Sequence, residues 1–158
     1  YDQEPDRPFQ INSFKITDKK GREENIFSIK DQIFVHVNFI VRQHTMDLMV
    51  NLSIFENGEL LLASNINDKD NKYSFRIKKG EYKSTIFIPE LTLKSGNYQL
   101  RVNMGISNYL GNVFDTKDGI EIKVHDKIEG LATNTALTTR AGKVLFPVKW
   151  DVNFKELE

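Results

Sequence analysis

Strict alternation of apolar and polar side chains is the feature that most restricts what this chain can fold into. Between residues 98 and 106 every second position is apolar, and Gln99, Arg101 and Asn103 lie between them. Successive side chains of a β-strand point to opposite faces of a sheet, so this spacing predicts a strand with one apolar and one polar face. Two other stretches alternate in the same way, residues 32–42 and 48–55.

Turn signals and shorter strand-like segments fill most of the remaining chain. Asp18–Gly21 and Glu56–Gly58 are predicted to join neighbouring strands as tight turns. The further predicted strands are residues 10–17, 60–66, 82–88, 119–125 and a last one at 143–153, in which Val144, Phe146, Val148 and Trp150 share a face. No long helical period is present. Eight to ten short strands predict an all-β fold, an antiparallel β-sandwich of the immunoglobulin-like or jelly-roll type.

Length and composition restrict the class of protein further. A chain of 158 residues suits one domain, which we place at residues 10–158, after a polar linker or arm at residues 1–9. The chain begins with Tyr1, so we expect it to be an excised or processed part of a longer protein. It has no cysteine, which excludes a disulfide framework and favours a cytoplasmic location. Its 22 acidic and 22 basic residues balance, so we expect no nucleic-acid partner.

Motifs for catalysis or cofactor binding are missing from the sequence. No phosphate-binding loop of the GxxxxGK[ST] type is present. The three histidines, His36, His44 and His125, do not have metal-ligand spacing, and no nucleophile is paired with a base. We therefore expect neither an enzyme nor a cofactor.

The polar faces of the predicted strands carry the residue types that bind glycans. Amide, guanidinium and carboxylate groups pair with sugar hydroxyls, and an aromatic ring packs under the apolar face of a sugar. If these strands are neighbours, their side chains form one polar wall, made of His36, Asn38, Asn51, Ser53, Phe55, Gln99, Arg101 and Asn103. The segment Ser107–Asp118 is expected to rim it as a loop, with Tyr109, Asn112 and Asp115. Any solvated sheet face carries similar residues, so alternation alone leaves both interpretations open.

Several short motifs resemble one family. They are IPELTLKSGNYQLRV at residues 88–102, a following loop with Asp115, the short strand Gly119–His125, and GKVLFPVKW at residues 142–150. This sequence resembles the C-terminal carbohydrate-binding domain of the ATP-binding subunit of polysaccharide ABC transporters of the O-antigen (Wzt) type, from Ile11 to Trp150. No binding residue of the family is matched by a motif here.

The resemblance has several implications. It implies an immunoglobulin-like sandwich without catalytic activity that binds an O-antigen-like polysaccharide at its non-reducing end for export. It implies an ATPase domain upstream of Tyr1, a transmembrane transporter subunit as partner, and a location in the cytoplasm at the inner face of the cell membrane. It also implies a homodimer in which the C-terminal strand, Lys143–Asn153 here, is exchanged between protomers, with Glu129–Arg140 as a hinge.

Two other functional classes fit the same alternation. One is an immunoglobulin-like adhesion or interaction module that binds protein through an edge strand. Phe34 and Ile40 on the predicted polar face of residues 32–42 are consistent with packing on such a partner. The other is a periplasmic or surface domain without cysteine. A nucleotide-binding domain encoded directly upstream, in a cluster of glycosyltransferase genes, distinguishes the transporter interpretation from both.

Overall fold

The structure, a computed structural model, describes residues 1–2, 4–44, 48–66, 68, 77–108 and 111–126, and in this part of the chain all regular structure is strand. The nine strands are β1 (Phe9–Thr17), β2 (Ile26–Ser28), β3 (Ile33–Val41), β4 (Leu48–Glu56), β5 (Glu59–Asn65), β6 (Gly80–Ile88), β7 (Gly96–Asn108), β8 (Gly111–Thr116) and β9 (Ile120–His125). Among these residues there is no helix that could cross a membrane.

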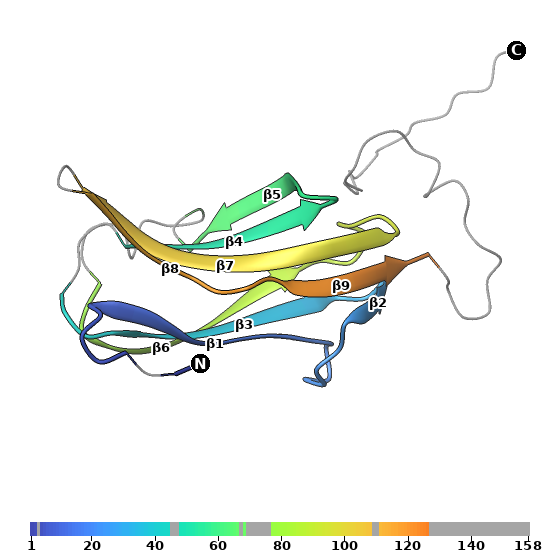
Figure 1. Ribbon diagram of the computed structural model, residues 1–158. Coiled ribbons are helices and arrows are strands. Elements are labelled where there is room, and N and C mark those ends of the chain that lie inside the picture. Colours follow the sequence, from blue (N-terminus) through green and yellow to red (C-terminus); the bar gives the residue numbers. More distant parts are fainter. Residues whose placement is uncertain (3, 45–47, 67, 69–76, 109–110, 127–158) are drawn as a thin grey trace, which may run out of the picture.

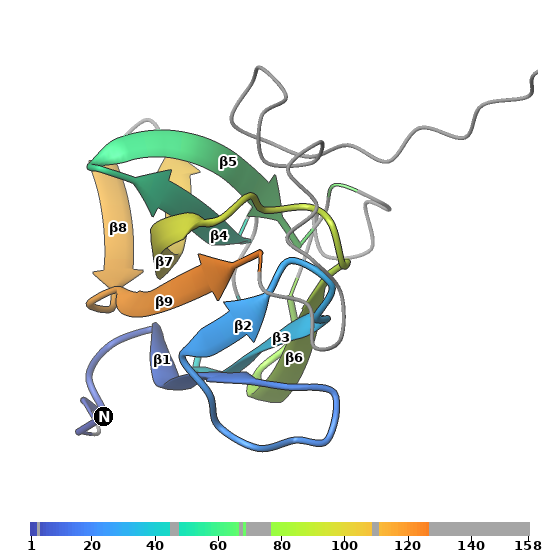
Figure 2. The same ribbon diagram turned by 90° about the vertical axis from the view of Figure 1, so that its right-hand side faces the viewer.

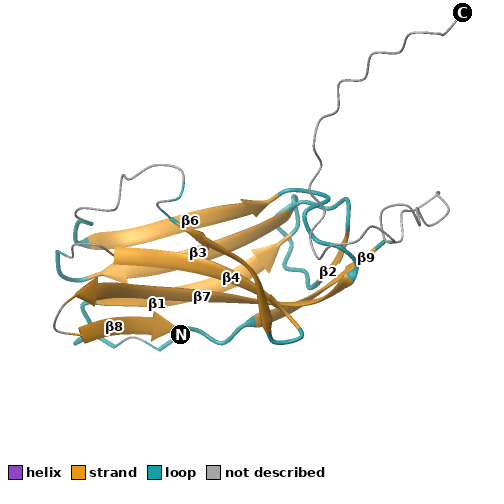
Figure 3. Ribbon diagram, turned by 90° about the horizontal axis from the view of Figure 1, so that it is seen from above, coloured by secondary structure: helices purple, strands orange, loops and turns teal. Residues whose placement is uncertain are grey.

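The strands form two sheets that pack face to face (Figure 1). One sheet has three strands in the order β1-β3-β6. The other has six, in the order β2-β9-β7-β4-β5, with β8 paired to the far end of β7. All pairs are antiparallel except β2 with β9. Viewed from above, the strands of the two layers run along the same general direction (Figure 3). The predicted β-sandwich is confirmed.

The core lies between the sheets and follows the alternation that the sequence shows. In β3 and β4 one set of alternating positions, all apolar, is buried, and the positions between them are half-buried. In β7, Tyr98, Leu100, Val102 and Met104 are buried, as predicted. Each fully buried large apolar side chain contributes roughly 1.5–3 kcal/mol before conformational entropy is subtracted. This burial fixes which face of each strand is left for recognition.

The predicted turn at Glu56–Gly58 is a tight hairpin between β4 and β5. Asn57 and Gly58 both have positive φ angles, 52° and 81°. Two consecutive positive φ angles define the type I′ turn, and Asn-Gly is its preferred sequence. The turn therefore places β5 directly beside β4 in the six-stranded sheet.

The segment Ser107–Asp118 differs from the prediction of a loop. Most of it forms a hairpin, because β7 continues to Asn108 and β8 pairs with it from Gly111 to Thr116. The segment lacks regular alternation, so local periodicity did not reveal the strand.

The N-terminal arm is tied to the sandwich by hydrogen bonds. β1 begins at Phe9, one residue before the predicted boundary, and Phe9 is buried. The buried Gln10 side chain donates to the carbonyl of Asp2 and accepts from the backbone N–H of Glu4 at 2.9 Å. The predicted last strand, Lys143–Asn153, the hinge at Glu129–Arg140 and Trp150 lie outside the described residues.

Candidate functional site

The structure divides the predicted site residues between two opposite outer faces. His36 and Asn38 lie on β3, in the three-stranded sheet. The other described members lie on β4 and β7 of the six-stranded sheet, Asn51, Ser53, Phe55, Gln99, Arg101 and Asn103. The expectation of one polar wall that includes His36 and Asn38 is therefore wrong, because β3 is a neighbour of β1 and β6 and not of β4 or β7.

On the three-stranded sheet the polar side chains bond to one another. The two ring nitrogens of His36 lie 2.9 Å from the hydroxyl oxygen of Thr17 and 3.2 Å from that of Thr85. Asn38 donates its amide to the hydroxyl of Ser13 at 2.8 Å. These hydrogen bonds connect β1, β3 and β6 and occupy both ring nitrogens of His36.

On the six-stranded sheet the predicted residues form three directly opposed pairs. The β4–β7 register places Asn51 opposite Asn103, Ser53 opposite Arg101 and Phe55 opposite Gln99. Directly opposed residues of an antiparallel pair have Cβ atoms about 4.5–5.5 Å apart. The six side chains therefore form one continuous patch on the outer face.

Arg101 is the centre of this patch. Its Nε–H donates to the side-chain oxygen of Gln99 at 2.8 Å, and its guanidinium carbon lies 4.8 Å from the centroid of the Phe55 ring. Phe55 was predicted to pack under a sugar, but one face of its ring supports Arg101. Arg101 is exposed, and its two terminal nitrogens form no hydrogen bond with the described residues. The guanidinium is therefore held in place with donors directed to solvent.

Gly119, before β9, packs against the stems of this pair. A Cβ atom at Gly119 would lie 2.4 Å from Cγ of Gln99 and 3.0 Å from Cγ of Arg101. Real Cβ contacts below 3.0 Å do not occur, so a side chain here would displace Gln99. The missing side chain of Gly119 therefore permits the observed position of Gln99.

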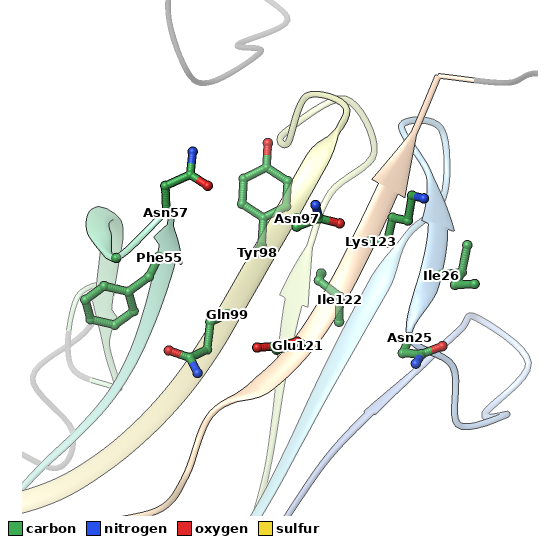
Figure 4. A pocket seen from close by; sticks show the side chains of 11 residues that line it. Asn25, Ile26, Phe55, Asn57, Asn97, Tyr98, Gln99, Glu121, Ile122 and Lys123 are labelled. Atoms are coloured by element: carbon green, nitrogen blue, oxygen red, sulfur yellow. The ribbon is translucent and has the colours of Figure 1, made fainter.

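An open groove of about 570 Å³ adjoins the patch (Figure 4). Phe55 and Asn57 lie on one side, Asn25 and Ile26 on the other, and Gln99 between them. The wall also includes Asn97, Glu121 and Lys123, and the register places Gln99 opposite Glu121 and Asn97 opposite Lys123. Amide donors and acceptors, a carboxylate and an ammonium thus surround one opening, which suits a ligand rich in hydroxyl groups.

Five polar residues of this groove were not predicted from the sequence: Asn25, Asn57, Asn97, Glu121 and Lys123. Asn97 lies two positions before Gln99 and so shares its face of β7. Glu121 and Lys123 alternate with the buried residues Ile122 and Val124, so the sequence could have predicted that their side chains point outward. No sequence signal placed β9 beside β7, or the three-residue β2 beside β9.

Tyr98 contributes a neutral phenol beneath the groove. Its side chain is buried at 2% exposure, and its hydroxyl donates to the carbonyl of Lys94 at 3.0 Å. Burial, together with the negative charge of Glu56, raises the pKa of Tyr98 to about 12. The phenol therefore stays protonated at neutral pH.

The expected rim residues do not add to the patch. Asp115 is buried at 3% exposure, where it accepts the backbone N–H of Ile11 at 2.6 Å and lies 3.2 Å from both Arg7 Nη1 and Lys117 Nζ. It is a structural residue, so its expected place in the rim is wrong. Tyr109 and the side chain of Asn112 lie outside what the structure describes. The described residues contain no cluster of three or more metal-ligating side chains.

The chain is thus a β-sandwich of two sheets, with amides, an arginine and an open polar groove on one outer face. A family model described as "Wzt C-terminal domain" matches residues 5–133, and this chain belongs to that family. The resemblance in the sequence is thus confirmed, and with it the broad class, a carbohydrate-binding domain of an ABC transporter.

A solved structure supports the fold. The chain is similar to the protein in "Crystal structure of the C-terminal domain of wzt", with a TM-score of 0.66, 12% identity, and coverage of 93% of this chain and 84% of the other. No curated protein sequence matches this chain.

Proposed function

We propose that this domain binds a polysaccharide on the outer face of its six-stranded sheet, at the patch around Arg101 and in the adjoining groove. The observation that carries the proposal is the set of three opposed pairs on β4 and β7, directly beside a groove of about 570 Å³. Family membership supports the ligand class. The site acts by binding and not by catalysis.

The chemistry of the patch favours sugar hydroxyls as ligand groups. Arg101 presents two donors in one plane, which matches a pair of neighbouring oxygen atoms. Asn103 and Ser53 lie beside it and add both donors and acceptors. Phe55 supports the guanidinium and reduces the freedom that Arg101 loses when a ligand binds.

In the parent protein, the proposed ligand is an O-antigen-like glycan that is recognised at its non-reducing end before export. The proposed partners are an ATPase domain in the same polypeptide and a transmembrane transporter subunit, at the cytoplasmic face of the membrane. We also propose a homodimer to which the strand Lys143–Asn153 contributes by exchange. Truncation after Gly142, followed by sedimentation and thermal melting, tests the dimer, because a monomer with an unchanged melting temperature contradicts it.

Calorimetric titration tests the binding site. The probe is the polysaccharide made by the gene cluster that carries this gene. Arg101→Ala is expected to weaken binding roughly ten- to hundredfold, since a hydrogen bond from a charged group contributes about 1.5–3 kcal/mol. Asn103→Ala should weaken it less.

His36→Ala is the matched control, because His36 lies on the opposite outer face. His36→Ala should bind the polysaccharide with the same affinity as the unsubstituted domain. Melting temperatures of Arg101→Ala and the parent should agree, since an exposed side chain contributes little to stability. Equal affinities of Arg101→Ala, Asn103→Ala and the parent contradict this site.

A further inference from the structure

Ile26 is an exposed apolar side chain at the edge of the recognition face. It begins β2, the strand at one edge of the six-stranded sheet, and pairs with Lys123 of β9. Its exposure is 57%, whereas the next residue, Phe27, is almost completely buried. The two residues before it, Glu24 and Asn25, are polar and exposed. A large apolar group in such surroundings remains in water unless a ligand covers it.

Two depressions meet at Ile26. One is the groove described above, and the other is a cleft of about 400 Å³ that Ile26 also lines. Figure 2 shows β2 between β9 on one side and the loop that follows β1 on the other. The groove is on the β9 side, and the cleft is bounded by that loop and by residues 30–32, which precede β3.

The cleft is highly charged but electrically balanced. Its basic members are Lys19, Lys20, Arg22 and Lys30, and its acidic members are Asp18, Glu24, Asp31 and Glu90. An anionic ligand would meet as many carboxylates as cations. An uncharged chain rich in hydroxyl groups meets no such repulsion, and the lysines and glutamates of the lining offer it donors and acceptors.

The walls of the cleft are fixed by their own hydrogen bonds. Asp18 accepts the backbone N–H groups of Lys20 and Arg22 at 2.8 and 3.0 Å, and both Nε and Nη2 of Arg22 at 2.9 and 2.6 Å. On the other side, Asp31 accepts the backbone N–H of Ser28 at 2.7 Å. A surface held in this way requires little ordering when a ligand binds.

We propose that the glycan site continues from the groove over Ile26 into this cleft, so that the domain holds a run of several uncharged sugar residues and not only a terminal one. Each depression has the volume of a small-molecule site, so each accommodates at least one sugar ring. Ile26 supplies the apolar contact between them, under the C–H face of a ring. This inference rests on the proposed function and adds the length and charge of the ligand.

The test is the dependence of affinity on glycan length. The probes are size-sorted oligosaccharides that keep the non-reducing end, prepared by partial hydrolysis of the polysaccharide used above. Affinity for the parent domain should rise with length until the chain spans both depressions. Ile26→Ala should then weaken the longest fragments roughly three- to tenfold and the shortest fragments less, because only fragments that cross from the groove into the cleft cover both sides of Ile26.

Phe87→Ala is the control. Phe87 is 48% exposed on β6, an edge strand of the three-stranded sheet, and it lines neither depression. It should bind every fragment like the parent. Lys30→Gln, which alters the cleft alone, should weaken long fragments roughly two- to fivefold.

Three outcomes are decisive. A length-dependent loss in Ile26→Ala supports the extended site. If affinity does not depend on fragment length but Arg101→Ala still weakens glycan binding, the extended site is wrong. The proposed function is then unaffected. If neither the fragments nor the intact polysaccharide bind the unsubstituted domain, both the extended site and the proposed function are wrong.

Discussion

The two outer faces of this sandwich carry similar residue types but use them differently. On the three-stranded sheet, His36 contacts a hydroxyl group on each side, and Asn38 donates to Ser13. On the six-stranded sheet, Arg101 uses one nitrogen to fix its position and directs two others to solvent. Residue type alone therefore does not distinguish a recognition surface from a solvated sheet face. On the six-stranded sheet Asn51 also accepts the side-chain amide of Asn65 at 2.7 Å, so the distinction lies in the two terminal nitrogens of Arg101, which form no hydrogen bond with the described residues.

The largest expected effect concerns Tyr98, buried beneath the recognition face. Its pKa is about 12 in the folded protein and about 10 when unfolded. Between these values the unfolded state binds fewer protons, so stability from the neutral phenol is complete below pH 10 and lost as pH rises through 12. We expect this loss to reach about 2–3 kcal/mol.

Denaturant unfolding from pH 8 to 12 measures this loss, and Tyr98→Phe should not show it. Tyr82→Phe is the control from the three-stranded sheet, where the Tyr82 hydroxyl donates to the carbonyl of Lys78 at 2.7 Å. Tyr82→Phe should still lose folding stability as the pH rises from 10 to 12. A parallel pH dependence in Tyr98→Phe and the parent would falsify the assignment.

The second prediction separates the two faces by stability. His36→Ala should lower the free energy of unfolding by about 1–2 kcal/mol, because the Thr17 hydroxyl, on a residue 2% exposed, loses its partner. Gln99→Ala, on the other face, should change it by less than about 0.5 kcal/mol. Urea unfolding of both variants measures the difference. If Gln99→Ala is the more destabilising of the two, the comparison of the faces is wrong.

The smallest expected effect sharpens the recognition face itself. Gly119→Ala should displace Gln99, break its hydrogen bond with Arg101 and weaken glycan binding about three- to tenfold. Asp118→Ala, one residue earlier and exposed, is the control and should bind like the parent. If Gly119 acts through Gln99, Gly119→Ala should have no further effect in a Gln99→Ala background. An additional loss of affinity in the double variant would point to another cause.

Parts of this molecule follow from local sequence and others do not. The residues of β3, β4 and β7 that face the core were predictable, because burial of one face of a strand makes every second residue apolar. The Asn57-Gly58 turn was predictable from its backbone requirement. The assignment of Asn38 and Asn51 to opposite sides of the sandwich was not, because both occupy polar positions on alternating strands, and local periodicity contains no information on which strands pair.

The candidate site shows the same limit. Arg101, Gln99 and Asn103 were found because they share one strand and one parity. The contribution of Lys123 and Asn25 depends on pairing between distant parts of the chain. Lys123 of β9 lies opposite Asn97, 26 positions earlier, and β2, which follows Asn25, pairs with β9. The stacking of Arg101 on Phe55 depends on side-chain packing across two strands, which alternation cannot specify.

The buried carboxylate of Asp115 has a consequence for how the two layers are aligned. Apolar contact holds two sheets together but is not directional, so by itself it tolerates small sliding of one layer over the other. Asp115 belongs to β8 in one layer, and its bond to the N–H of Ile11 ends in β1 of the other. A hydrogen bond of 2.6 Å allows only a narrow range of length and angle, so this bond restricts how far one layer can slide over the other. The position of the sheet that carries Arg101 is thereby fixed relative to β1 of the other sheet.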